Sequence, residues 1–430
     1  MASDELYHSP CVHAPPFPQT ASSLPRRQLA RLAKVRGAPL SGADTGLEMP
    51  FALTEEDVAI HDMAREFARE RLAPHAVEWD QAKHFPVDVL RAAAGLGMGG
   101  VYVPGDHGGT GLSRLAAVLL FEALAEGCPA ISAYISIHNM CAWMVSAFGN
   151  DEQQSRWLPS LVSMQRLASY CLTEPGAGSD AAALKTRAVR DADYYVLNGQ
   201  KQFISGAGNE DGFYIVMVRT GEDGPNGISA LVVEGGTPGL GFGANEKKMG
   251  WNAQPTRAVI FDNARVPVRN RLGTEGMGFR MAMAGLDGGR LNIAACSLGG
   301  AQVAFERALR YMTERKAFGR SLTEFQALQF RLADMATELE AARIFLYATA
   351  EAYDRDLPDK TCRIAMAKRF VTDAGFNVAN EALQLFGGYG YLSEYGIEKL
   401  VRDLRVHQIL EGTNEIMRVI ISRALIAEIA

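Results

Sequence analysis

The residue with the clearest chemical potential is a single glutamate near the carboxyl end of the chain. Glu411 lies between the apolar pair Ile409-Leu410 and a glycine, Gly412. Apolar neighbours remove water from a carboxylate and raise its pKa above about 4.3, toward the range that a general base needs. Gly412 lets the backbone come close to a ligand. A glutamate just before a helix is more often an ordinary capping residue, so the assignment depends on the other segments of the chain.

The bulk composition is that of an ordinary globular enzyme. The chain has 430 residues, 48% of them hydrophobic and 21% charged, and its net charge is -6. This length predicts two or three domains, and the acidic balance argues against a nucleic-acid-binding protein. No run of about eighteen apolar residues is free of polar interruption, so no membrane span is expected. The six cysteines lack CxxC spacing and partner histidines, which favours free thiols over a metal site.

The first fifty residues differ from the rest, being rich in Pro, Ser, Ala and Arg. A basic cluster there is typical of a mitochondrial transit peptide, whereas Asp4 and Glu5 fit that class poorly. We expect residues 1–50 to be a disordered leader, either a transit peptide or an over-long start, with the folded part beginning near Thr54. The compartment stays open between the mitochondrial matrix and, for a bacterial protein, the cytoplasm.

The spacing of apolar residues divides the remaining chain into three parts. The run Thr54-Glu55-Glu56-Asp57 predicts a helix start, and helical spacing follows it. From about Ser169 the pattern indicates strands, including a hairpin over residues 194–204 with an Asn198-Gly199 turn. Helical spacing returns after Gly278. We therefore expect a multi-domain α+β protein, with an N-terminal helical domain (51–168), a middle antiparallel β domain (169–277) and a C-terminal helical bundle (278–430).

Two glycine-rich segments match dinucleotide-binding patterns without the required context. Residues 95–100 read GxGxxG, and residues 176–181 read GxGxxA. Neither follows a strand and opens a helix within a βαβ unit, which argues against a nicotinamide site. The chain also has no P-loop, HExxH or GxSxG motif, so kinase and hydrolase functions lose their usual signatures. His407, four residues before Glu411, is expected to pack or hydrogen-bond rather than act as an acid or a ligand.

Four further segments combine polar groups, glycines and aromatics. Residues 170–180 end a strand in a Gly/Ser turn that offers hydroxyls and backbone N–H groups. Residues 201–206 place an aromatic and a hydroxyl on one side of a strand. Residues 314–319, with Phe325-Gln326, offer an arginine fork for pyrophosphate and aromatics for adenine. Residues 384–391 end a helix in glycines. Taken singly, each is equally a polar turn, a core strand, a solvated helix end or a C-cap.

Together with the glutamate segment, these four segments resemble the acyl-CoA dehydrogenase family. The resemblance runs in order from about Thr54 to the end of the chain. Finer features at residues 245–252, 254–257 and 406–412 resemble the isobutyryl-CoA branch of that family. The resemblance implies an FAD-dependent dehydrogenase for a short branched-chain acyl-CoA, best isobutyryl-CoA to methacrylyl-CoA in valine degradation. It also implies that electrons pass to electron-transfer flavoprotein.

Other functions stay open at this point. Substrates such as 2-methylbutyryl-CoA or short straight-chain thioesters are not excluded, because a sequence does not display the volume of a pocket. An acyl-CoA oxidase shares the fold and the base but is reoxidised by oxygen. A non-catalytic scaffold protein is the alternative from a different class, and the intact Glu411 and flavin segments argue against it.

The resemblance also implies roles for matching residues. Glu411 falls on the catalytic base, since Gly289 stands where some relatives carry theirs and a glycine cannot take a proton. Substrate contacts are implied for Ser179, Asp287, Gly288, Gly289, Arg290 and Arg423. The FAD ring and ribityl chain would meet Tyr170, Leu172, Thr173, Gly178, Ser179, Phe203, Ile204 and Ser205. The pyrophosphate and adenosine of FAD would meet residues of a neighbouring chain, namely Arg315, Phe318, Phe325, Gln326, Gln384, Leu385, Phe386, Gly387 and Gly388. Three further FAD contacts, Thr413, Asn414 and Glu415, are implied at the start of the last helix. The resemblance also implies a homotetramer, and it implies no metal.

Overall fold

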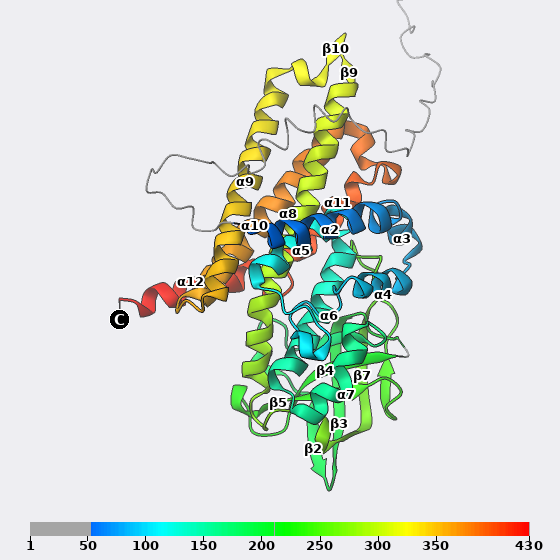
Figure 1. Cartoon of the computed structure of the whole chain (residues 1–430), viewed down its shortest axis with the longest axis vertical. Coiled ribbons are helices and arrows are strands. Elements are labelled where there is room, and N and C mark those ends of the chain that lie inside the picture. Colours follow the sequence, from blue (N-terminus) through cyan, green and yellow to red (C-terminus); the bar gives the residue numbers. More distant parts are fainter. Residues whose placement is uncertain (1–52, 210, 430) are drawn as a thin grey trace, which may run out of the picture. The chain divides into compact units, whose positions relative to one another are not determined.

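The computed structural model describes residues 53–209 and 211–429, and its elements follow the predicted order of helices, strands and helices (Figure 1). The leader predicted over residues 1–50 lies outside the described residues. The first helix, α2 (Glu55–Phe67), begins where the sequence predicts. The Asp57 N–H donates to the Thr54 hydroxyl at 3.1 Å, and the Thr54 N–H donates to the Asp57 carboxylate at 2.9 Å. This reciprocal capping box satisfies two N–H groups that a helix start leaves free.

The N-terminal part is helical throughout. α2 continues into the π-turn η1 (Ala68–Leu72), and the helices that follow are α3 (Ala76–Ala82), α4 (Val87–Gly95), α5 (Arg114–Gly127), α6 (Pro129–Phe148) and α7 (Asp151–Val162). Nearly every residue of α5 is buried, because α2, α6, α8 and α9 all pack against it. A nearly all-apolar helix of this kind is a core helix, as its composition indicates.

The middle part is one mixed sheet in the order β6-β7-β3-β2-β4-β5-β8, with β1 paired to β4. Its strands are β1 (Leu167–Cys171), β2 (Arg187–Asp191), β3 (Tyr194–Ser205), β4 (Gly212–Arg219), β5 (Ile228–Glu234), β6 (Leu240–Phe242), β7 (Thr256–Pro267) and β8 (Arg271–Leu272). Most pairs are antiparallel, as predicted, whereas β1 and β2 each run parallel to β4. The end of β1 therefore lies near the end of β3, which brings two predicted site segments into one region.

The hairpin predicted at Asn198-Gly199 is wrong. β3 runs through both residues, and the turn lies earlier, at Ala192-Asp193, where β2 pairs with β3. Gly199 has φ 145° and marks a register shift between β3 and β7. A Cβ at this position would lie 2.7 Å from the Thr186 Cα. The glycine is needed for an irregularity in a long strand that passes close to Thr186, rather than for a turn.

The C-terminal part is built around one very long helix. α8 (Gly278–Glu314) has 37 residues and is therefore about 55 Å long. It runs from the sheet to the short hairpin β9 (Lys316–Ala317) and β10 (Arg320–Ser321), as Figure 1 shows. α9 (Gln326–Asp354) and α10 (Lys360–Phe386) pack along α8, and α11 (Ile397–Arg405) and α12 (Asn414–Ala427) complete this part.

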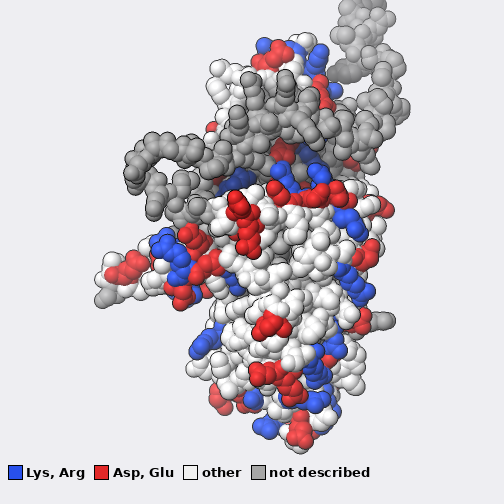
Figure 2. Space-filling view, in the orientation of Figure 1, with Lys and Arg blue, Asp and Glu red and all other residues white. Residues whose placement is uncertain are grey.

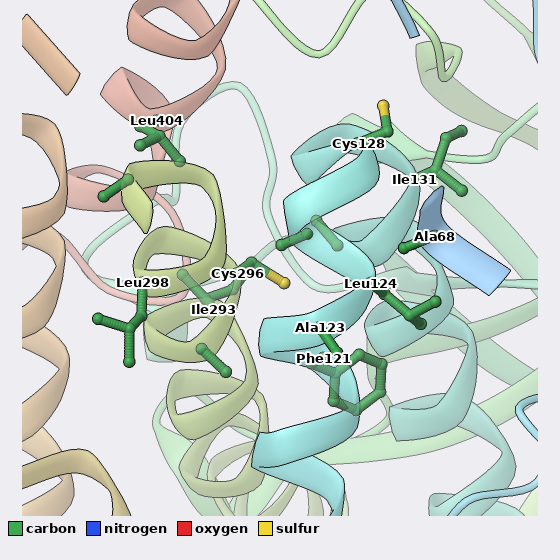
Figure 3. Close-up of a cluster of buried hydrophobic side chains, with 14 of the residues drawn as sticks. Ala68, Phe121, Ala123, Leu124, Cys128, Ile131, Ile293, Cys296, Leu298 and Leu404 are labelled. Atoms are coloured by element: carbon green, nitrogen blue, oxygen red, sulfur yellow. The ribbon is translucent and has the colours of Figure 1, made fainter. Parts of the chain in front are cut away.

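The core between α5, α6 and α8 fixes the middle of α8. Figure 3 shows Phe121 and Leu124 of α5 beside Ile293 and Cys296 of α8. At Gly299 an added Cβ would lie 2.0 Å from the Glu122 carbonyl oxygen, so the two helices approach as closely as a glycine allows. Close packing of this kind leaves side chains on the adjoining turns of α8 in fixed positions.

The exposed charged side chains are mixed in sign. On the face of the described residues that Figure 2 shows, Lys and Arg are interspersed with Asp and Glu. Of the helices in the described ranges, none has both the length and the apolar character needed to cross a membrane.

A buried ion pair holds the turn after β1 against β3. Lys201 is fully buried, and its Nζ donates to Glu174 Oε1 at 2.7 Å and to the Leu172 carbonyl at 3.1 Å. The Glu174 carboxylate also accepts from the N–H groups of Lys185 and Thr186, at 2.6 and 2.9 Å. Both ions therefore have several hydrogen bonds, which a buried pair needs if it is not to destabilise the fold.

We expect Lys201→Met to lower the free energy of unfolding by about 3–5 kcal/mol, because it leaves the Glu174 carboxylate buried without its cation. Urea unfolding of the purified variant measures the loss. Arg265→Met is the matched control: its partner is Asp191, and the two side chains are 50% and 56% exposed. This control is expected to cost less than about 1 kcal/mol. Equal losses in the two variants would contradict the structural role given to Lys201.

Candidate active site

Glu411 lies in the turn between the 3-10 segment η9 (Val406–Gln408) and α12, with its carboxylate against α8. The turn at residues 411–414 is called the Glu411 turn below. A Cβ added at Gly289 of α8 would lie 2.6 Å from Glu411 Oε2. The carboxylate therefore occupies the space that any side chain at position 289 would require. The glutamate and the glycine that the sequence analysis paired are direct neighbours.

The electrostatics of Glu411 suit a group that accepts a proton. Its Oε2 is buried and has no hydrogen-bond partner among residues 53–209 and 211–429. Burial raises the pKa of the carboxyl to about 7, while the positive charges of Lys368 and Arg290 oppose the rise. A carboxylate that titrates near neutral pH and keeps an unused oxygen can act as a general base toward a ligand.

The backbone of the Glu411 turn is held in an unusual conformation. Glu411 has φ 54° and Gly412 has φ 89°. Left-handed backbone costs a non-glycine residue roughly 1 kcal/mol, so the surroundings must hold it in place. Arg290 Nε of α8 donates to the Glu411 carbonyl at 3.1 Å, and Lys368 Nζ of α10 donates to the Gly412 carbonyl at 2.8 Å. Two helices thus hold two successive carbonyls.

The substrate contacts predicted on α8 belong to the hydrogen-bond network that holds the Glu411 turn. Arg290 donates from Nη1 to Asp287 Oδ1 at 2.7 Å, and Thr361 donates to Asp287 Oδ2 at 2.9 Å. Asp287 is therefore a structural partner of Arg290 and more than a surface residue. At Gly288 an added Cβ would lie 2.4 Å from Arg114 Nη1. Arg423 is exposed on α12.

His407 has the packing and hydrogen-bonding role that the sequence analysis expects. The Trp251 indole N–H donates to His407 Nε2 at 3.2 Å, and Nδ1 lies 2.6 Å from the Ser297 hydroxyl. Because Nε2 accepts, the ring proton is on Nδ1. Burial, with the nearby charge of Lys368, lowers the pKa of His407 to about 3. His407 is thus neutral near pH 7. The described part of the chain also has no group of three His, Cys, Asp or Glu residues that could hold a metal ion.

The two segments predicted to meet a flavin ring lie side by side. The Gln202 N–H donates to the Thr173 carbonyl at 2.8 Å, and the Ser169 hydroxyl donates to the Ser205 carbonyl at 2.8 Å. Phe203 is 65% exposed, with φ 60°, and Ser205 is half-buried. An exposed aromatic beside a hydroxyl suits a planar ligand with polar edges.

Two side chains predicted for this region face the core instead. Ile204 is 2% exposed, because strand alternation turns it away from Phe203 and into the sheet. Leu172 is also buried, and its carbonyl already accepts from Lys201. Both residues can therefore offer a ligand only backbone groups.

The turn after β1 is open, and Tyr170, near the end of β1, reaches the Glu411 region. A Cβ added at Gly178 would meet nothing within 4 Å, and Ser179 is exposed. The Tyr170 hydroxyl lies 3.5 Å from the Ala282 carbonyl of α8. Burial raises the pKa of Tyr170 well above its ordinary value, and the neighbouring charge of Glu411 adds to the rise. The flavin segments and the candidate base therefore meet at the same part of α8.

A second group of predicted residues surrounds a hollow of about 600 Å³ beyond the other end of α8. Its lining includes Arg315, Gln384, Leu385, Phe386, Gly387 and Gly388. The Arg315 guanidinium lies 5.4 Å from the Tyr389 ring centroid. Added Cβ atoms at Gly387 and Gly388 would meet nothing within 4 Å. An open, largely apolar hollow with two guanidinium groups, those of Arg315 and Arg331, suits a phosphate joined to a flat base.

The remaining predicted contacts are scattered around these two groups. Phe318, 95% exposed at the tip of the β9–β10 hairpin, has its ring 6.2 Å from that of Phe325, and Gln326 opens α9. Thr413 caps α12, and Glu415 is exposed. The Asn414 side chain is tied to Lys368 and Asp373, at 2.9 and 2.7 Å. Its side-chain amide is therefore already bonded within the chain, and the contact predicted for Asn414 stays a prediction that rests on the backbone N–H groups at the start of α12.

The two groups cannot serve one ligand within a single chain. Tyr170 touches Ala282 near the start of α8, whereas Arg315 caps its end (Figure 1). The helix between them is about 50 Å long, far longer than one dinucleotide. A ligand that meets both groups must therefore take one of them from another copy of the chain.

The sequence analysis overlooked Lys368. It lies on the buried face of α10, among Ile364, Ala365, Ala367 and Val371, and is 0% exposed. A lysine at a core position of an apolar helix stripe needs a partner, since a charge is almost never buried without one. A lysine at an apolar position of this helix was therefore the feature of the sequence that could have identified Lys368.

Comparisons with known proteins agree with this geometry. The chain matches the descriptions "Acyl-CoA dehydrogenase, N-terminal domain" over residues 54–165, "middle domain" over 169–264 and "C-terminal domain" over 276–426. It is 53% identical to an isobutyryl-CoA dehydrogenase, mitochondrial, of Bos taurus, covering 93% of this chain and 97% of that protein. A second isobutyryl-CoA dehydrogenase, mitochondrial, from Dictyostelium discoideum is 55% identical, with coverages of 87% and 90%. The solved butyryl-CoA dehydrogenase of Megasphaera elsdenii has a TM-score of 0.84 at 37% identity, with coverages of 87% and 99%.

We expect one buried carboxyl group to titrate with a midpoint at about 7. Infrared difference spectra recorded across a pH titration detect the protonated carboxyl C=O stretch, which should disappear as the pH rises through that value. Glu411→Gln should abolish this band, because the amide does not titrate. A band that persists in the variant would assign the titration to another residue.

Proposed function

The chain belongs to the acyl-CoA dehydrogenase family, and we propose that it removes two hydrogens from a short branched acyl-CoA, with isobutyryl-CoA as substrate and methacrylyl-CoA as product. The observation that carries the proposal is the buried Glu411 carboxylate, with an unpaired oxygen, opposite the side-chain-free Gly289. The two isobutyryl-CoA dehydrogenases at 53% and 55% identity support the choice of acyl group.

The residues of this chain fit FAD. Phe203 and Ser205 present an aromatic face and a hydroxyl next to the open turn at Gly178, close to Glu411. The hollow beside Arg315 offers a guanidinium for the pyrophosphate and open glycine backbone at residues 387–388. When bound, FAD supplies the two-electron acceptor for the hydride that leaves the acyl β-carbon.

Glu411 would take the proton from the acyl α-carbon. In water a thioester α-proton is too weakly acidic for a carboxylate, so the developing negative charge on the thioester oxygen must be stabilised. The Glu411 N–H donates to no backbone carbonyl in the described ranges and is a candidate donor to that oxygen. Because only the ionised carboxylate accepts a proton, kcat/KM should rise with pH through about 7.

Assembly and electron transfer extend the proposal. We propose a homotetramer in which the Arg315 hollow of one chain completes the flavin site of another; the length of α8 supports the sharing of this site between two chains. Light scattering of the flavin-loaded protein measures the assembly, and a monomer with full flavin content would contradict it.

Electrons would pass to electron-transfer flavoprotein. The two relatives named as mitochondrial support the mitochondrial matrix as the compartment.

We predict that Glu411→Gln retains the yellow flavin but loses at least about 10³-fold in the rate of flavin bleaching by isobutyryl-CoA, because the amide cannot accept the α-proton. Stopped-flow absorbance under anaerobic conditions measures the rate. Glu152→Gln, an exposed glutamate in the first turn of α7, is the control and should bleach at the wild-type rate. Bleaching of the Glu411 variant at a near-wild-type rate would refute the assignment.

A panel of acyl-CoA thioesters tests the substrate. We expect isobutyryl-CoA to give the highest kcat/KM, above 2-methylbutyryl-CoA and butyryl-CoA, with electron-transfer flavoprotein or a dye as acceptor. A single misfitting methylene costs about 1–3 kcal/mol, or roughly 10- to 200-fold. A higher value for a straight-chain thioester would replace the proposed substrate. Peroxide formed without an added acceptor would identify an oxidase, and purified protein without flavin absorbance would favour a scaffold.

A further inference from the structure

We infer that Lys368, on the buried face of α10, is a positioning residue for Glu411: it fixes the Glu411 turn and favours the ionised carboxylate. This inference rests on the proposed role of Glu411 as the base. Lys368 Nζ donates to the Gly412 carbonyl and to Asn414 Oδ1 of the Glu411 turn, so its effect passes through Glu411.

The hydrogen bonds of Lys368 are directed at the Glu411 turn. Its Nζ donates to the Gly412 carbonyl at 2.8 Å and to Asn414 Oδ1 at 2.9 Å. Asn414 is itself held, since its amide donates to Thr372 at 3.0 Å and to Asp373 at 2.7 Å. The ammonium thus joins Gly412 to Asn414 across the second half of the turn, whose first two residues, 411 and 412, have left-handed backbone. Without these donors, a buried carbonyl and a buried amide oxygen would each lose a partner.

The charge of Lys368 acts on Glu411 without a directly bonded counter-ion among the described residues, although the negative charges of Asp373 and Glu415 also act on Lys368. Arg290 also faces Glu411, but it forms an ion pair with Asp287 at 2.7 Å. Both partners of Lys368 in the turn are neutral oxygens. The other titratable groups near Glu411 are Tyr170 on β1 and Cys296 on α8, and burial raises the pKa of each, which keeps both uncharged.

Lys368 itself remains largely charged at neutral pH. Burial lowers its pKa to about 8, while the negative charge of Glu411 opposes that shift. The two groups therefore stabilise each other's charged forms. Removing the ammonium should raise the pKa of Glu411, so a higher pH would be needed to ionise the base.

Lys368→Gln tests this inference, because glutamine keeps a hydrogen-bond donor and removes the charge. We expect the midpoint of the Glu411 carboxyl band to move up by about one pH unit, with a fall of about fivefold in kcat/KM at neutral pH that is regained at alkaline pH. KM for isobutyryl-CoA should change little, so the loss lies in kcat. Flavin content should stay at the wild-type level.

Lys248→Gln is the matched control. Burial also lowers the pKa of Lys248 to about 8, and its Nζ donates to the carbonyls of Trp251 and Gln254 at 2.8 Å each and to the Thr256 hydroxyl at 2.7 Å. It is not among the charges that act on Glu411. We expect this variant to lose thermal stability while the Glu411 midpoint stays unchanged. An equal midpoint shift in both variants would reduce the effect to general loosening and overturn the inference.

A second variant covers the case in which Lys368→Gln does not fold. Lys368→Arg keeps the charge and should leave the midpoint close to the wild-type value, whereas an upward shift in this variant would overturn the electrostatic role. An unchanged midpoint in folded Lys368→Gln would do the same. The infrared readout needs no acyl-CoA, so it still reports on Lys368 if isobutyryl-CoA is not the substrate. Failure of the proposed base would show separately, as activity that survives in Glu411→Gln.

Discussion

The site depends on one constraint: a carboxylate must be kept out of water, unpaired and correctly directed, beside a helix that leaves it room. A buried carboxylate without a partner is costly, and a left-handed backbone at the same residue adds to the cost. The structure meets both demands from outside the glutamate. Gly289 provides the space, and Arg290 and Lys368 hold the carbonyls of Glu411 and Gly412. The carboxylate oxygen itself stays available because its neighbours bond the backbone instead.

α8 links this turn to the rest of the fold. Its first turns pack against the sheet, its middle is fixed against α5 and α6, and its end carries Arg315 beside the second hollow. The mixed pairing of the sheet contributes equally, because the parallel β1–β4 pair brings the turn after β1 next to the end of β3. Aromatic, hydroxyl and carboxylate groups from three separate parts of the chain are thereby placed around the first third of one helix.

Local patterns predicted what depends on local physics. The capping box at Thr54 and the order of helical and strand segments followed from residue types and spacing, whereas the pairing of Glu411 with Gly289 followed from the family resemblance. The Asn198-Gly199 turn failed because a long-range approach to Thr186, which no local pattern records, uses the glycine within a strand. The directions of the Ile204 and Asn414 side chains could not be predicted for a related reason: tertiary packing decides whether a side chain faces a ligand or the core. Lys368 was overlooked because its partners are 44 and 46 positions away along the chain.

The separation of the Glu411 region from the Arg315 hollow along α8 also has a consequence for thermal stability. If each flavin is bound by two chains, dilution causes subunits and flavin to dissociate together, because the loss of either one weakens the binding of the other. The apparent melting temperature should then rise with the concentrations of protein and of free flavin, by mass action. Heat resistance measured at one concentration would describe the assembled holoenzyme rather than the single polypeptide.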